Sequence, residues 1–252
     1  MDQAFLLGAG LLAGIVGSVA SLASLVSYPA LLALGLPPVS ANVTNTVALV
    51  FSGLGAVAGS RPELAGQGRQ VLRLAAITAV GGAAGAALLL ATPARWFEYV
   101  APVLIAAGSL AMFRPRPAAA ETAASPAASP ARPGWASRLA VLGVAVYLGY
   151  FGAAGGILLL AVLLRVVAGP LARVNAVKNV IGGAANAVAG IGFAVFGPVR
   201  WAAVLPLALG FLAGGWTGPK IVRRLPAAGL RVFIGCVGLA LAIRLGLSAY
   251  GA

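Results

Sequence analysis

The sequence predicts an all-α integral membrane protein built from two related halves, and two observations lead to this prediction. The first is composition, because the 252 residues are 61% hydrophobic and only 8% charged, with a mean hydropathy of +1.03. A soluble domain carries about a quarter charged residues. The second is an internal repeat, since residues 42–107 reappear, weakly altered, 133 positions later. The chain is therefore suited to lipid, and it carries a duplicated hydrophobic unit.

The repeat is carried by identical residues spread along both copies. The matched pairs are Asn42 with Asn175, Val47 with Val180, Gly59 with Gly192, Leu72 with Leu205, Gly81 with Gly214, Gly82 with Gly215, Gly85 with Gly218 and Pro93 with Pro226. A duplicated hydrophobic unit is typical of secondary transporters, which place the substrate site between the halves. Transport is therefore the leading functional hypothesis.

Six segments are long and apolar enough for a spanning helix, which needs about 20 residues: 42–60, 71–91, 96–113, 174–196, 201–219 and 229–249. Two further stretches, about 4–36 and 138–168, are long for one helix and short for two crossings. Glycines, serines and Pro29 interrupt the first, and GYFGAAGG at 149–156 interrupts the second. We predict a re-entrant hairpin of two half-helices in each, because broken backbone is tolerated where it lines a cavity. Eight simple transmembrane helices, two of them long and tilted, are the alternative.

Loop charge favours the hairpins. With one hairpin and three full spans in each half, 14 of the 17 Lys and Arg residues fall on one side of the membrane, in the loops 61–73, 114–138, 165–178 and 220–231. Eight simple spans divide the same charges nearly evenly, so the positive-inside rule prefers the hairpins. An odd number of full crossings also makes the halves inverted repeats, with both termini outside.

The expected organisation is a first membrane repeat at 1–113, a linker at 114–137 and a second repeat at 138–252. The linker is rich in Pro, Ala and Ser and has no apolar face, which indicates a flexible cytoplasmic tether. The first residues lack the basic region of a signal peptide, so we expect mature sequence from the start.

Several functions are disfavoured by composition. The chain has no His, a single Cys and four acids, which are Asp2, Glu63, Glu98 and Glu121. A metal site of His, Cys and carboxylates is almost excluded, as is His-based acid–base catalysis. We therefore expect that the chain is not an enzyme and that it binds no cofactor and no metal. The net charge of +13 indicates orientation and contact with anionic lipid rather than nucleic-acid binding.

The most concentrated polar signal is SANVTN at 40–45 and its counterpart RVNAVKN at 173–179, each following a predicted hairpin. Amides and hydroxyls donate hydrogen bonds to an oxyanion, and Lys178 adds a mobile cation. Half-helix N-termini and glycine-rich backbone at the hairpin tips would add further donors. The expected substrate-binding residues are Asn42, Thr44, Asn45, Asn175, Lys178, Asn179, Asn186, Gly155 and Gly156. The gating candidates, beside the breaks, are Tyr28, Pro29 and Tyr150.

Structural alternatives remain open for these residues. In one alternative, Lys178 snorkels to the cytoplasmic surface, because it lies only one or two turns into its helix. In another alternative, the paired asparagines form hydrogen bonds between helices and do not bind substrate. No acid falls plainly within a membrane core, so we expect neither a carboxylate proton relay nor a carboxylate sodium site. The donor set favours an anion.

Taken together, these motifs resemble the sulfite exporter TauE/SafE family of bacterial membrane proteins. In the first half the matching features are Gly14, Gly17, Pro29, Gly35 and ANVTN at 41–45. In the second half they are GYFGAAGGI at 149–157, NAVKN at 175–179 and GGWTGPKIVRRL at 214–225. The likeness covers most of the chain outside the linker. One departure is GSVASLASL at 17–25, where the family usually has a Gly-Gly-rich stretch.

The resemblance implies a secondary transporter of the cytoplasmic (inner) membrane that exports a small sulfur-containing anion. Sulfite, sulfoacetate and related organosulfonates are the implied substrates, moved through a site between two inverted repeats. The alternatives are a carrier for another small anion or metabolite, and a membrane assembly factor without transport. The expected partners are the anion and the lipid bilayer but no nucleic acid, with a homo-oligomer left open.

Overall fold

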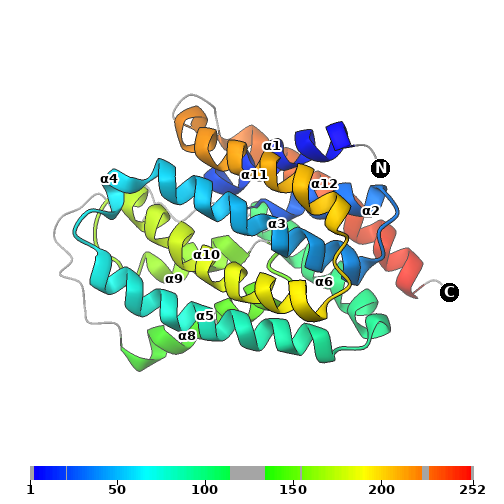
Figure 1. Ribbon diagram of the computed structural model, residues 1–252, viewed down its shortest axis with the longest axis horizontal. Coiled ribbons are helices and arrows are strands. Elements are labelled where there is room, and N and C mark those ends of the chain that lie inside the picture. Colours follow the sequence, from blue (N-terminus) through cyan, green and yellow to red (C-terminus); the bar gives the residue numbers. More distant parts are fainter. Residues whose placement is uncertain (1–2, 21, 114–133, 154, 223–226, 251–252) are drawn as a thin grey trace.

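The computed structural model describes residues 3–20, 22–113, 134–153, 155–222 and 227–250 (Figure 1). Every element in these ranges is a helix and none is a strand, so the predicted all-α class is confirmed for them. The helices of the first half are α1 (Gln3–Ala20), α2 (Ser24–Ala33), α3 (Pro38–Gly59), α4 (Arg61–Leu64), α5 (Gly68–Ala91) and α6 (Ala94–Phe113). Those of the second half are α8 (Trp135–Tyr150), α9 (Gly155–Leu163), α10 (Leu171–Phe196), α11 (Trp201–Val222) and α12 (Ala227–Tyr250). Most of the predicted linker lies outside the described residues.

Each of the two interrupted apolar stretches is divided into two helices. The first becomes α1 and α2, and the second becomes α8 and α9, with Gly152 in the left-handed region (φ 72°) at the second break. The 10 residues of α2 and the 9 of α9 rise only about 15 Å, half of a hydrocarbon core of about 30 Å. The predicted hairpins account for this division, whereas one long continuous helix in each stretch does not.

The longer helices coincide with the six predicted spans but begin three or four residues earlier in several cases. Proline explains one of these differences, because Pro38 occupies the first turn of α3, where its missing N–H would have no helical partner. Four described helices are long and apolar enough to cross a membrane, by length and composition. They are α3, α5, Ala172–Phe196 of α10 and Trp201–Gly218 of α11.

The repeat seen in the sequence recurs in the helices and their packing. The helices α10, α11 and α12 each begin 133 residues after α3, α5 and α6. Contacts follow the same correspondence, because α1 packs along α11 and α8 packs along α5, while α3 meets α10 and α6 meets α12. The first helix of each half therefore packs on the other half. In Figure 1, α3 runs in the opposite direction to α10, and α5 runs in the opposite direction to α11.

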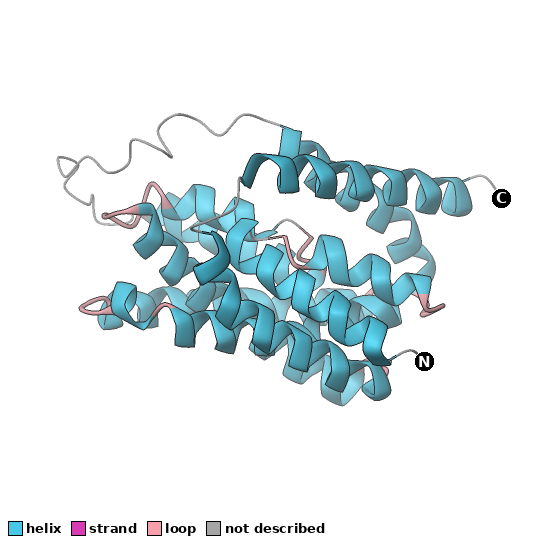
Figure 2. Ribbon diagram, turned by 90° about the horizontal axis from the view of Figure 1, so that it is seen from above, coloured by secondary structure: helices cyan, strands magenta, loops and turns pink. Residues whose placement is uncertain are grey.

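The two ends of the bundle hold different loops. The start of α1 and the end of α12 lie at one end, here called the terminal end (Figures 1 and 2). The short helix α4 lies at the other end, here called the α4 end (Figure 1). Gln70 Nε2 donates to the Val166 carbonyl at 3.4 Å, which places the loop after α9 beside the start of α5 at the α4 end. Eight complete crossings would put these two segments at opposite ends. The contact therefore supports the hairpin topology.

Small residues bring helix backbones close together. A Cβ added to Gly14 would lie 2.8 Å from the Phe211 carbonyl oxygen, and one added to Gly215 would lie 2.7 Å from that of Ser52. Such close approach is how helices associate where the surrounding lipid is as apolar as the side chains. Large apolar side chains point outward on α5 and α11, with Leu72 72% and Leu205 67% exposed. Both features suit a multi-pass membrane protein.

Candidate functional site

A cavity of about 100 Å³ lies where the two helix breaks meet α3 and α10. It runs from the middle of the bundle toward the α4 end, because α3 lines it with residues 46–56 and α10 with residues 178–186. This volume is enough for several water molecules or a small ion. Its polar side chains are Ser18, Ser24, Thr46, Ser52, Lys178, Asn179 and Asn186. Both hairpin breaks therefore contribute to one polar site.

Lys178 gives this cavity its positive charge. Its side chain is 4% exposed and lines the cavity, which is not the position of a lysine that snorkels to the surface. Within the described part of the chain, no carboxylate lines the cavity. Among the described residues, the cavity lining therefore carries a positive charge and no negative one.

Two amides accompany the lysine on α10. Asn179 and Asn186 both line the cavity, and Asn179 Nδ2 is buried without a hydrogen-bond partner among the described residues. An unpaired buried donor is uncommon in folded proteins, and an oxyanion would satisfy this one. Thr46 stands 133 residues before Asn179 and lines the cavity from α3, so the two repeats contribute polar groups from equivalent positions.

Asn42 and Asn175 occupy equivalent positions and form equivalent hydrogen bonds across the two halves. Asn42 Nδ2 donates to the Tyr150 carbonyl at 2.9 Å, and Asn175 Nδ2 donates to the Ser18 carbonyl at 3.3 Å. Each accepting carbonyl lies near the end of a broken helix, where carbonyls lack intrahelical partners. These two amides thus hold each break to the opposite half, and neither is among the residues that line the cavity.

The remaining predicted residues of the first repeat form hydrogen bonds around α3. Asn45 Oδ1 accepts from Ser27 Oγ at 2.6 Å, and its Nδ2 donates to Ser24 Oγ at 3.3 Å. Thr44 Oγ1 accepts from the Arg200 backbone N–H at 2.9 Å. These contacts fix the first hairpin and the start of α11 against α3.

The predicted glycines divide between two positions. Gly156 lines the cavity, whereas a Cβ on Gly155 would lie 2.6 Å from a methyl carbon of Leu148, so Gly155 allows α9 to pack on α8. The backbone at the second break thus borders the cavity at Gly152 and Gly156.

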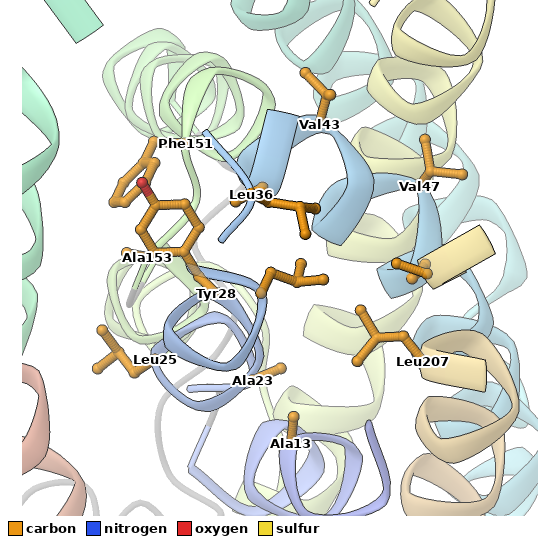
Figure 3. Packing of buried hydrophobic residues seen from close by; sticks show 14 of the residues in the cluster. Ala13, Ala23, Leu25, Tyr28, Leu36, Val43, Val47, Phe151, Ala153 and Leu207 are labelled. Carbon is orange, nitrogen blue, oxygen red and sulfur yellow. The ribbon is translucent and has the colours of Figure 1, made fainter. Parts of the chain in front are cut away.

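A group of packed aromatic residues borders the cavity at Phe151. Phe151 lines the cavity and packs edge-to-face on Tyr28, with ring centroids 5.3 Å apart (Figure 3). Phe97 contacts Phe151 at 5.6 Å and Tyr150 at 6.0 Å. Of the predicted gating residues, Tyr28 and Tyr150 belong to this group, and Pro29 lies beside it within α2.

Sequence reasoning missed several residues of this site. Phe151 was not singled out, although it stands inside the GYFG break. The hydroxyls of Ser18, Ser24, Thr46 and Ser52 were also missed. The run of serines in the first hairpin and the repeat position shared by Thr46 and Asn179 were the available signals.

Comparison with known proteins gives one family. Searches of curated proteins and of solved structures returned no match. Among the described residues, no group of three or more His, Cys, Asp or Glu side chains is placed to hold a metal ion. The model of the sulfite exporter TauE/SafE family matches residues 6–245, nearly the whole chain. The chain therefore belongs to the sulfite exporter TauE/SafE family of membrane transporters.

Proposed function

We propose that this chain exports a small sulfur-containing anion, such as sulfite or sulfoacetate, through the cavity between two inverted repeats. The observation that carries the proposal is a buried lysine beside amides and hydroxyls, with no carboxylate among the described residues of the cavity lining. An ammonium and a unit anion about 4 Å apart attract by about 4 kcal/mol at an effective dielectric constant of about 20. The unpaired Asn179 amide would add a directional hydrogen bond to one anion oxygen.

The packing supports an alternating-access route. Equivalent helices run in opposite directions (Figure 1), and the two breaks lie at the cavity, as in transporters that bind substrate at discontinuous helices. The cavity extends toward the α4 end, and Phe151 in its lining packs on Tyr28 of α2. The anion would enter at the α4 end, and movement of the aromatic pair would release it at the other.

Orientation and energetics fit export. Exposed arginines Arg61 and Arg69 lie at the α4 end, and the positive-inside rule would make that end cytoplasmic and the termini external. An anion leaving an inside-negative cell gains about 2.3 kcal/mol per charge per 100 mV. A uniporter of the inner membrane would therefore work without a proton-relay acid.

Efflux from proteoliposomes tests this function. Vesicles holding the purified protein are loaded with sulfite or sulfoacetate, and efflux is compared for the wild type, Lys178→Met and Arg244→Met. Methionine keeps the length of the side chain and removes the charge. Arg244, an exposed cation on α12, is the matched control. We expect saturable efflux for the wild type and the control, and at least a tenfold loss for Lys178→Met.

Two results would count against the proposal. Efflux of sulfur-containing anions no faster than from empty vesicles would reject this substrate class, and other small anions would be tested next. Full efflux by a folded Lys178→Met protein would show that the anion does not depend on the cavity lysine.

A further inference from the structure

We propose that a second cavity, at the terminal end, binds a monovalent cation through Glu98 and Tyr28. This cavity also measures about 100 Å³ and lies between α2, the start of α3, the first half of α6 and the end of α12. Its polar side chains are Tyr28, Glu98 and Ser248. The binding of a cation here goes beyond the proposed anion export and does not depend on it.

The charge of this cavity is opposite to that of the first. Glu98 lines it, whereas the other acid among the described residues, Glu63, lies on α4 at the far end. Glu98 is exposed at the cavity, and the exposed cations Arg95 of α6 and Arg244 of α12 are not part of its lining. A carboxylate with hydroxyl groups forms an all-oxygen donor set, which repels an anion and attracts a hard cation.

The single carboxylate limits the charge of that cation. Ca²⁺ takes about 6–8 oxygen ligands and Mg²⁺ requires nearly ideal octahedral geometry, and both usually rely on more carboxylates than this cavity offers. One carboxylate balances one positive charge. A monovalent ion such as Na⁺ or K⁺, which keeps some of its water in a cavity of this size, therefore fits best.

Tyr28 provides the second, independent observation. Its side chain is only 2% exposed, it lines the cavity, and its hydroxyl has no hydrogen-bond partner among the described residues. A buried hydroxyl without a partner is unfavourable. A cation, or a water molecule bound to it, would contact the phenolic oxygen and complete the site. Figure 3 shows the Tyr28 hydroxyl projecting from its ring beside Phe151.

The position of Tyr28 also links the two cavities. Tyr28, which lines the second cavity, packs edge-to-face on Phe151, which lines the first. If the first cavity carries an anion, as proposed above, a cation bound at Glu98 would neutralise the negative charge of this carboxylate. The carboxylate would then no longer repel the anion on the exit side.

Thermal unfolding of the purified full-length protein tests the cation site without any flux measurement. The unfolding temperature is followed while NaCl or KCl replaces N-methyl-D-glucamine chloride at constant ionic strength. We expect a saturable rise for the wild type, because a ligand that binds only the folded state stabilises it. Glu98→Gln should raise the apparent Kd at least about tenfold, a loss of about 1.4 kcal/mol, whereas Glu63→Gln, the matched control, should titrate like the wild type.

Tyr28→Phe is the second variant, because it keeps the ring on Phe151 and removes only the hydroxyl. It should weaken the cation-dependent rise, and it decides the question if Glu98→Gln fails to fold. The proposal is overturned if N-methyl-D-glucamine stabilises the protein as well as Na⁺ and K⁺ do, or if Glu98→Gln or Tyr28→Phe titrates like the wild type. Failure here would leave anion export untouched, since efflux and unfolding are measured separately.

Discussion

Replacing Asn42 with leucine should loosen the second helix break. The Asn42 side chain is 1% exposed and donates to the carbonyl of Tyr150, the last residue of α8, at 2.9 Å. Leucine has a similar size and shape but cannot donate a hydrogen bond. The change therefore removes the tie between α3 and the break while keeping most of the packing.

The expected cost follows from this geometry. A typical hydrogen bond contributes about 0.5–1.5 kcal/mol net, and a buried acceptor left without its donor raises the loss to about 1–3 kcal/mol. At about 2–4 °C per kcal/mol for a chain of this size, the unfolding temperature should fall measurably. The bond of Asn175 to Ser18 is longer, at 3.3 Å, so Asn175→Leu should cost less than Asn42→Leu.

Thermal unfolding in mild detergent measures the loss, and amide hydrogen exchange locates it. We expect faster exchange around residues 151–156 in Asn42→Leu. Thr217→Val is the control, because the Thr217 hydroxyl donates at 2.7 Å to Ala213 in its own helix, a bond that does not join the two halves. An Asn42→Leu protein within about 0.5 kcal/mol of the wild type, the range of ordinary surface changes, would refute the reasoning.

Two further changes test the packing and the gate. Gly14→Ala should cost about 1–3 kcal/mol by overpacking, because its Cβ would lie 2.8 Å from the Phe211 carbonyl oxygen, whereas Gly8 has no atom within 4 Å of an added Cβ and Gly8→Ala should be neutral or stabilising in thermal unfolding. Equal stability of the two variants would contradict the close approach of α1 and α11. Phe151→Ala should make proteoliposomes leak loaded sulfite faster, because it removes the ring that packs on Tyr28. Unchanged leakage by a folded Phe151→Ala protein would argue against this gate.

The helices and their order were accessible from sequence, because apolar length and the 133-residue offset are local or simply periodic signals. The roles of the asparagines were less accessible. An amide donates equally well to an anion and to a backbone carbonyl, and Asn42 reaches a carbonyl 108 residues away. Only the assembled bundle decides which acceptor lies within reach, so Asn179 lines the cavity while Asn42 holds a helix break.

The missed hydroxyls have a different cause. Serine in a helix commonly bonds a carbonyl of its own preceding turn, and Ser18 Oγ does so with Ile15 at 2.9 Å. Its second role, lining the cavity, depends on the break that follows. The sequence places no acid plainly within a membrane core, yet the packing of α6 against α3 and α12 brings Glu98 into the same cavity as Tyr28.

Protection of an introduced cysteine would test the anion cavity most directly. In a Cys236→Ser background, which removes the exposed native thiol, Ser52→Cys places a thiol in the cavity lining and Ala65→Cys places one in the exposed loop after α4. Sulfoacetate should slow maleimide labelling of the first thiol and not of the second, and Lys178→Met should abolish that protection. Sulfoacetate transport without any protection at Ser52→Cys, or equal slowing at both positions, would contradict a substrate site beside Lys178.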